Sequence, residues 1–451
     1  MKNYVCIIMC FLAGMETYSQ EFSETDTIPT VLERINSDLS SMKKLKISGY
    51  LQSQVQFADT AGIESYAGGN FSSGFDNRIG IRRGRVKFGY TNDLSMYVLQ
   101  IDATEKGISL KDAYLQFTDP VIETFTFTGG VFDRPFGYEI SYSSSLRESP
   151  ERSRLFQTLF PGERDLGGKI TIQPPKHSRY NFIKFEGGVF NGTGPTVTDF
   201  DNYKDIISHL SFNRSFLTER LNIGFGCSYY NGGWRQGTNY RYLITDVMQP
   251  DNSYIRGFSQ DSTHGNIRSR VRREYKGLDI QITFQSSLGI TVLRGEYITG
   301  RQPSTAKSSV SPSAQPVENT IYRVNGTTAT PYTAFSDAYL RDFEGGYIYF
   351  VHNIMQTKHQ VVAKYDWYDP NTRIARDQIG VKNSKTGAAD IMYTTIGLGW
   401  IYRWNSNVKL MAYYDRVTNE TTKYIYHGST LKALSRDRND NVLTFRVQYK
   451  F

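Results

Sequence analysis

Strict alternation of apolar and polar residues recurs along most of this 451-residue chain. In its last segment, Leu443, Phe445 and Val447 are separated by Thr444 and Arg446. Successive side chains of a β-strand point to opposite faces, so each such segment predicts a strand with one apolar and one polar face. The alternation therefore favours an all-β fold.

Composition narrows the choice of architecture. The mean hydropathy is -0.46, although Phe, Trp and Tyr make up 14% of the residues. Disordered chains are poor in aromatic residues, and a helical membrane protein needs runs of about 20 apolar residues, which this sequence lacks. A soluble β-sandwich and a transmembrane β-barrel both remain, since the strands of both alternate.

Connection lengths favour the barrel. We expect about 16 strands, with short connections after even-numbered strands and mostly long ones after odd-numbered strands. The predicted strands cover residues 46–57, 78–90, 93–102, 108–118, 122–133, 165–173, 180–190, 203–213, 220–230, 276–286, 289–300, 343–352, 358–368, 390–404, 407–418 and 441–451. Residues 46–451 are thus predicted to form a transmembrane antiparallel β-barrel with short periplasmic turns and long extracellular loops. A barrel of this size leaves an aqueous channel, which indicates passive transport.

The amino end predicts export. A short basic start precedes the apolar residues 4–14, and a polar stretch follows, so residues 1–20 are predicted to be a cleavable signal peptide. Met9 before Cys10 is not the small residue of a lipid-attachment site. Removal of the signal takes two of the three cysteines and leaves Cys227 without a partner for an intramolecular disulfide.

Residues 21–45 have a different pattern. Apolar residues recur there at three- and four-residue spacing, which predicts a short amphipathic helix. They are Ile28, Val31, Leu32, Ile35, Leu39 and Met42. We expect a periplasmic segment that either tethers to the barrel or mediates association.

Several segments together resemble the phosphate-selective porin O and P family of outer-membrane channels. The likeness spans residues 45–451. The segments that show the likeness are ISGYLQSQVQF (47–57), RRGRVKFGY (82–90), GGVFDRPFG (129–137), ERS (151–153), RDLG (164–167), RGEY (294–297) and the terminal YKF.

The resemblance implies a homotrimer of 16-stranded barrels in the outer membrane. It also implies that the loop after the fifth strand, here called the constriction loop (residues 134–165), folds inward and narrows the pore. Phe451 resembles the terminal aromatic residue that the barrel assembly machinery recognises.

Basic residues occupy predicted lumen positions. In the second strand Val86 and Phe88 belong to the lipid face, so Arg83, Arg85 and Lys87 should point into the lumen. A charge on the lipid face near the midplane costs roughly 2 to 4 kcal/mol. Lys184 and Arg294 also fall on lumen-facing positions of their strands. Rings of Arg and Lys favour anions, whereas ordinary solvated lumen charge is the alternative explanation.

The constriction loop carries balanced charge. Its charged residues are Arg134, Arg147, Arg152, Arg154, Arg164, Glu139, Glu148, Glu151, Glu163 and Asp165. The five positive and five negative charges cancel, which predicts a transverse electric field across the pore. This balance departs from the arginine-rich lumen expected of a phosphate-selective channel. We expect some of these residues to pin the loop, in particular Glu151 with Arg152 or Arg154.

Other functions find less support. Arg268, Arg270 and Arg272 share one predicted strand face, where they could attract anions or contact lipopolysaccharide. Despite a pI near 9.1, no nucleic-acid-binding module is recognisable. The six His are scattered without metal spacing, and no nucleophile and base are evident, so we expect neither enzyme nor cofactor.

The leading prediction is therefore a porin for small polar solutes with a modest anion preference, for example for phosphate or other oxyanions. Two alternatives stay open. One is a secreted soluble protein that binds carbohydrate. The other is an adhesin or enzyme that uses a plugged barrel as an anchor.

Overall fold

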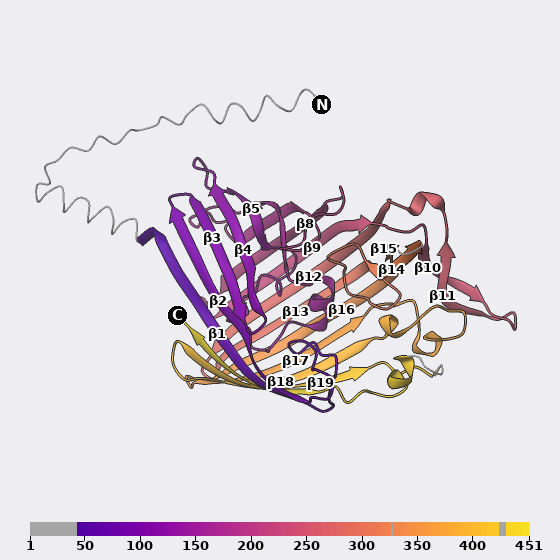
Figure 1. The fold of residues 1–451 in the computed structure, drawn as a ribbon. Coiled ribbons are helices and arrows are strands. Elements are labelled where there is room, and N and C mark those ends of the chain that lie inside the picture. Colours follow the sequence, from indigo (N-terminus) through magenta and orange to yellow (C-terminus); the bar gives the residue numbers. More distant parts are fainter. Residues whose placement is uncertain (1–42, 326–327, 424–429) are drawn as a thin grey trace, which may run out of the picture. The chain divides into compact units, whose positions relative to one another are not determined.

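The computed structural model describes residues 43–325, 328–423 and 430–451. Sixteen strands of this part close into a barrel (Figure 1). In ring order they are β1 (Leu45–Ala58), β2 (Asn77–Asn92), β3 (Ser95–Thr104), β4 (Gly107–Thr118), β5 (Phe125–Asp133), β6 (Arg164–Ile172), β7 (Ile183–Phe190), β8 (Asp205–Phe216), β9 (Leu221–Arg235), β12 (Arg270–Ser286), β13 (Gly289–Ser304), β16 (Ala338–Ile354), β17 (His359–Asp369), β18 (Tyr393–Arg403), β19 (Val408–Asn419) and β20 (Val442–Lys450).

The first and last strands close the ring. β20 pairs antiparallel with β1 from Tyr50 opposite Lys450 to Ala58 opposite Val442. Beyond this ladder, Gly49 and Phe451 exchange two backbone hydrogen bonds of 3.1 and 3.0 Å. A closed ring leaves no unpaired strand edge, which is the requirement for a sheet in lipid. The predicted 16-stranded antiparallel barrel is confirmed.

Two hairpins were not predicted. β10 (Arg241–Met248) pairs with β11 (Tyr254–Asp261), and β14 (Val317–Asn325) pairs with β15 (Thr328–Phe335). Both lie within segments predicted only as long connections. β10 joins β16 through two parallel residue pairs, so this hairpin extends the sheet beyond the barrel ring.

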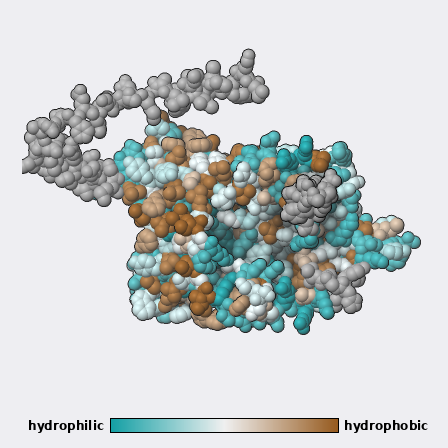
Figure 2. Space-filling model, viewed as in Figure 1, coloured by the Kyte–Doolittle hydropathy of each residue, from teal (hydrophilic) through white to brown (hydrophobic). Residues whose placement is uncertain are grey.

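The outer surface of the strands is apolar. Exposed side chains on outward positions include Leu51, Leu115, Phe127, Leu278, Ile348, Leu398, Trp400 and Phe445. Figure 2 shows brown, hydrophobic residues over the strands at the left of the view and teal residues toward the loops at the right. Among the described residues, no helix is long and apolar enough to cross a membrane.

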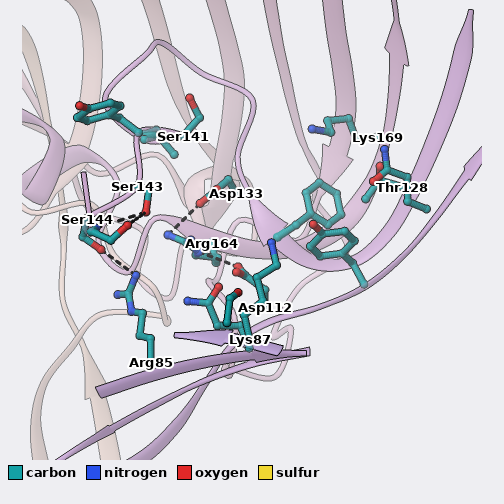
Figure 3. A pocket seen from close by; sticks show the side chains of 18 of the residues that line it. Arg85, Lys87, Asp112, Thr128, Asp133, Ser141, Ser143, Ser144, Arg164 and Lys169 are labelled. Atoms are coloured by element: carbon teal, nitrogen blue, oxygen red, sulfur yellow. Dashed lines mark hydrogen bonds and ion pairs between the residues drawn. The ribbon is translucent and has the colours of Figure 1, made fainter. Parts of the chain in front are cut away.

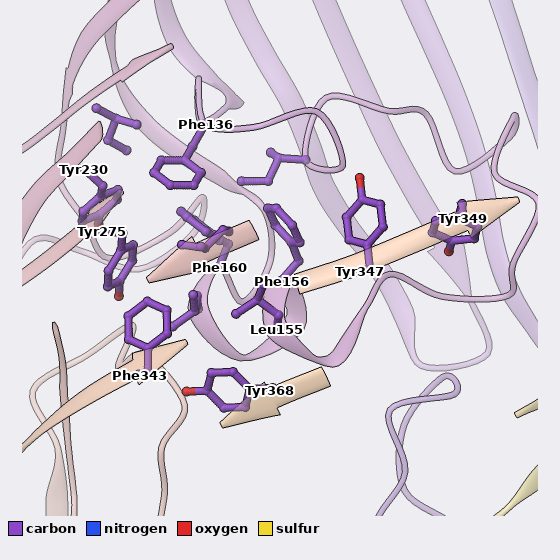
Figure 4. Packing of buried hydrophobic residues seen from close by; sticks show 14 of the residues in the cluster. Phe136, Leu155, Phe156, Phe160, Tyr230, Tyr275, Phe343, Tyr347, Tyr349 and Tyr368 are labelled. Carbon is purple, nitrogen blue, oxygen red and sulfur yellow. The ribbon is translucent and has the colours of Figure 1, made fainter. Parts of the chain in front are cut away.

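The largest apolar core lies inside the barrel, under the constriction loop. The loop leaves β5, carries α2 (Arg154–Leu159) and returns to β6. Phe160 lies 5.7 Å from Tyr275 and 5.9 Å from Tyr230, measured between ring centres, and Phe156 lies 6.2 Å from Tyr347 (Figure 4). The loop is therefore packed against the inner wall formed by β9, β12 and β16, and the inward fold expected for it is confirmed.

The predicted signal peptide and helical segment lie outside the described residues, apart from residues 43–45.

Candidate pore and constriction loop

Glu151 fastens the constriction loop to the wall. Its carboxylate accepts from Arg82 at 2.7 Å, from Arg83 at 2.6 Å and from Arg446 of β20 at 3.2 Å, and only 6% of its side chain is exposed. Burial opposes ionisation of Glu151, but the guanidinium groups of Arg82, Arg83 and Arg446 outweigh it and hold the pKa of Glu151 well below its usual range. Glu151 is thus ionised at neutral pH and bridges the loop to two strands.

The prediction that Glu151 pairs with Arg152 or Arg154 is wrong. Arg152 instead pairs with Glu163 and donates to the backbone oxygens of Glu139 and Ile140 at 2.8 Å, and so stabilises the turn of the loop itself. The guanidinium of Arg154 lies between two rings, 4.3 Å from the centre of Tyr66 and 3.8 Å from that of Tyr393. Sequence neighbours were poor guides, because Glu151 finds its partners on the wall and Arg152 finds its own farther along the loop.

A second set of contacts holds the segment before Glu151. Ser144 bonds the Tyr50 hydroxyl at 2.6 Å. The Lys409 Nζ donates to the backbone oxygens of Ser145 and Arg147 at 3.1 Å. Arg294 of β13, four strands from β19 in the ring, pairs with Glu148. The loop is therefore bound to three separate strands of the wall, β1, β19 and β13.

The two ends of the loop are braced by buried ion pairs. Arg134 lies 3.2 Å from Asp165, and Arg164 lies 2.9 Å from Asp112 of β4 and 2.9 Å from Asp133 of β5. Glu139 accepts a hydrogen bond of 2.7 Å from the Ser153 hydroxyl. These contacts fix the points at which the loop leaves and rejoins the wall.

The loop leaves a cavity of about 560 Å³ beside β1 to β7, and Figure 3 shows Arg85, Lys87 and Asp112 around it. Its lining includes Asp112, Asp133 and Glu186. The cationic residues that line it are Arg85, Lys87, Arg152, Arg164, Lys169, Lys184 and Lys450. The lining thus has seven cations and three carboxylates, and two further carboxylates, Asp102 and Glu163, pair with Arg85 and Arg152 from outside it.

The cations differ in how they are paired. Arg85 lies 2.9 Å from Asp102, and Lys169 and Lys184 share Glu186 at 2.6 and 2.7 Å. Lys87 and Lys450 make no ion pair within the described residues. The uncompensated positive charge of the cavity is therefore carried by lysines.

The predicted lumen residues fall into two groups. Arg85, Lys87 and Lys184 line the cavity. Arg83 and Arg294 face inward but are 3% and 5% exposed, because the constriction loop covers them. Their expected place on the open pore wall is thus corrected to a place beneath the loop.

Sequence reasoning missed residues that break the alternation. Ile79 and Ile81 are exposed, while Arg82 and Arg83 both contact Glu151, so the outward-facing positions of β2 switch from odd to even numbers along the strand.

A second break lies in β4, where Lys111 has no partner on β3. Gln100 is paired with Asp112, and the next residue of β3, Ile101, is paired with Leu110. A β-bulge aims two consecutive side chains to one face. Lys111 can therefore reach Glu163 of the loop at 3.2 Å.

The described residues hold no group of three or more His, Cys, Asp or Glu side chains placed to bind a metal ion.

Comparisons with known proteins identify the fold. No protein-family model matches the chain, and no curated protein does. OmpF of Salmonella typhi in complex with daunomycin has a TM-score of 0.50 and 10% identity over 90% of this chain and 97% of that chain. The chain has the porin fold.

Two further solved structures are similar over 90% of this chain. The outer membrane channel DcaP of Acinetobacter baumannii has a TM-score of 0.49 at 10% identity and is covered over 97% of its length. The trimer form of OmpT, an outer membrane protein of Vibrio cholerae, has a TM-score of 0.46 at 12% identity and is covered over 99%. The finer resemblance to the phosphate-selective porin O and P family stays a prediction.

Proposed function

We propose that this protein is an outer-membrane porin through which small polar solutes diffuse passively. The observation that carries the proposal is a closed barrel with an apolar exterior that encloses a charged cavity beside an inward loop. An exterior of this kind is unsuited to water and matches the band of a membrane barrel. It also counts against the soluble carbohydrate-binding alternative.

The cavity supports a modest anion preference. Its excess of cationic over acidic side chains attracts anions, phosphate and other oxyanions included, in the way that Arg and Lys rings select anions in pores. Arg85, Lys87 and Lys184 are the proposed attracting residues among those predicted from the sequence. Arg83 and Arg294 act indirectly, by holding the constriction loop.

Export and assembly follow from the sequence. We propose that residues 1–20 direct secretion, that residues 21–45 lie in the periplasm and that Phe451 is read by the barrel assembly machinery. The family resemblance implies a homotrimer. The arginines near Arg270 are proposed to contact lipopolysaccharide.

Single-channel recording tests the proposal. Purified protein added to a planar bilayer should produce stepwise ion currents, and the folded barrel should require detergent for extraction and migrate differently in gels before and after heating. A barrel that never conducts would support the plugged-anchor alternative. Extraction without detergent would support the soluble alternative.

A further inference from the structure

The cavity wall is not only charged. Tyr114 of β4 and Phe132 of β5 line it, with ring centres 6.0 Å apart in an edge-to-face arrangement. The Lys169 ammonium lies 5.5 Å from the centre of the Phe132 ring, which is only 4% exposed and supports Tyr114 from behind, so the partly exposed Tyr114 supplies the apolar surface of the cavity. Apolar surface facing water is unfavourable and is of no use to a hydrated inorganic ion. This wall therefore suits a solute with an apolar part.

The cavity arginines are engaged. Arg85 is paired with Asp102, Arg164 with Asp112, and Arg152 donates to two backbone oxygens. Strong recognition of phosphate uses the planar guanidinium fork in a bidentate contact. Because carboxylates and carbonyls already occupy these forks, the cavity offers little that distinguishes phosphate from other anions.

The available positive charge comes from lysines on both sides of the aromatic wall. Lys87 lies on β2 and Lys450 on β20. Lys169 of β6 and Lys184 of β7 share the carboxylate of Glu186. A lysine ammonium is a point charge on a flexible stem. It attracts a single carboxylate without demanding a fixed geometry.

Resting on the proposed porin function, we propose that the preferred solutes are organic monocarboxylates with an aromatic or other apolar body. The carboxylate is drawn to the cavity lysines, of which Lys87 and Lys450 are unpaired and Lys169 and Lys184 share Glu186, while the body passes over Tyr114. Tyr114 is then the residue that determines specificity, and inorganic phosphate is a poorer solute than an aromatic acid of lower charge.

Reversal potentials of the full-length protein in planar bilayers test this inference, with chloride on one side and benzoate or phosphate on the other. The wild type should pass benzoate more readily than phosphate. Tyr114→Ser should lower the permeability of benzoate relative to chloride about threefold to tenfold, the effect of losing an aromatic contact, and leave that of phosphate unchanged.

Gln116→Ser is the matched control, because Gln116 lines the same cavity on the same strand and has no ring. It should change neither ratio. Phosphate passing more readily than benzoate in the wild type, or Tyr114→Ser lowering both ratios alike, would overturn the inference. Chloride currents in the same recordings would show that the porin function itself stands.

Discussion

Glu151 is the residue on which the position of the constriction loop most depends. Glu151→Gln removes a buried charge that faces three arginines. Breaking a buried ion pair on one side costs roughly 3 to 5 kcal/mol, so the loop should leave the wall more often. We expect Glu151→Gln to give noisier single-channel currents with excursions to a larger conductance.

Asp199→Asn is the control for this variant. Asp199 pairs with Lys204 on the surface, where 22% and 41% of the side chains are exposed. Exposed pairs contribute about 1 kcal/mol or less, so its current traces should match the wild type. Equal noise in Glu151→Gln and Asp199→Asn would contradict the role of Glu151.

Acid should release the same contact only at low pH. The pKa of Glu151 is held below its usual range, so its pairing stabilises the loop at neutral pH. That contribution is lost as pH falls from about 4.3, the unfolded value, through the lower folded pKa. Current noise should be constant between about pH 7 and pH 5 and rise only in more acid buffer. An onset near pH 6 would show that another group controls the loop.

Residue-level positions were predictable only where the strand alternation is regular. Arg85, Lys87 and Lys184 were placed correctly toward the lumen by counting positions. Arg82 and Lys111 were not, because a switch in alternation and a bulge turn them inward. The partner Arg446 lies 295 positions from Glu151, and only the closed ring of strands brings the two together.

At the scale of elements, lumen glycines make room for large side chains. Gly399 of β18 faces Tyr413 of β19, and a Cβ atom at Gly399 would lie 2.4 Å from the Tyr413 ring. Gly399→Ala should therefore destabilise the barrel by about 1 to 3 kcal/mol, the cost of overpacking. The fall should be visible as a lower urea or thermal midpoint of the folded gel band.

Gly89→Ala is the matched control in β2. The nearest heavy atom to a Cβ at Gly89 is 3.9 Å away, which is ordinary contact. Its midpoint should stay at or slightly above that of the wild type. If both substitutions lower the midpoint equally, the loss reflects glycine replacement in general and not the packing of Tyr413.

The 16 barrel strands were predictable because alternation holds over most of each strand, even though β2 and β4 break it locally. The hairpins β10–β11 and β14–β15 were not predictable. They lie outside the barrel ring, so their strands need no apolar face toward lipid and no polar face toward the lumen. The inward fold of the constriction loop came from family resemblance. Its mechanism, aromatic packing of Phe156 and Phe160 on lumen tyrosines, needed the structure.

At the scale of the whole molecule, the chain carries a formal net charge of +8, while its constriction loop is balanced. The loop's own charges are mostly used in holding it to the wall. The excess in the cavity comes instead from the strands, chiefly from the lysines of β2, β6, β7 and β20. The wall and not the loop is therefore expected to set the sign of ion selectivity.

The reversal potential in a potassium chloride gradient tests this claim most directly. We predict that chloride crosses more readily than potassium in the wild type. Lys87→Glu combined with Lys450→Glu should shift the reversal potential toward the equilibrium potential of potassium without abolishing conductance. A wild-type channel that prefers potassium, or a double variant with unchanged selectivity, would contradict the account.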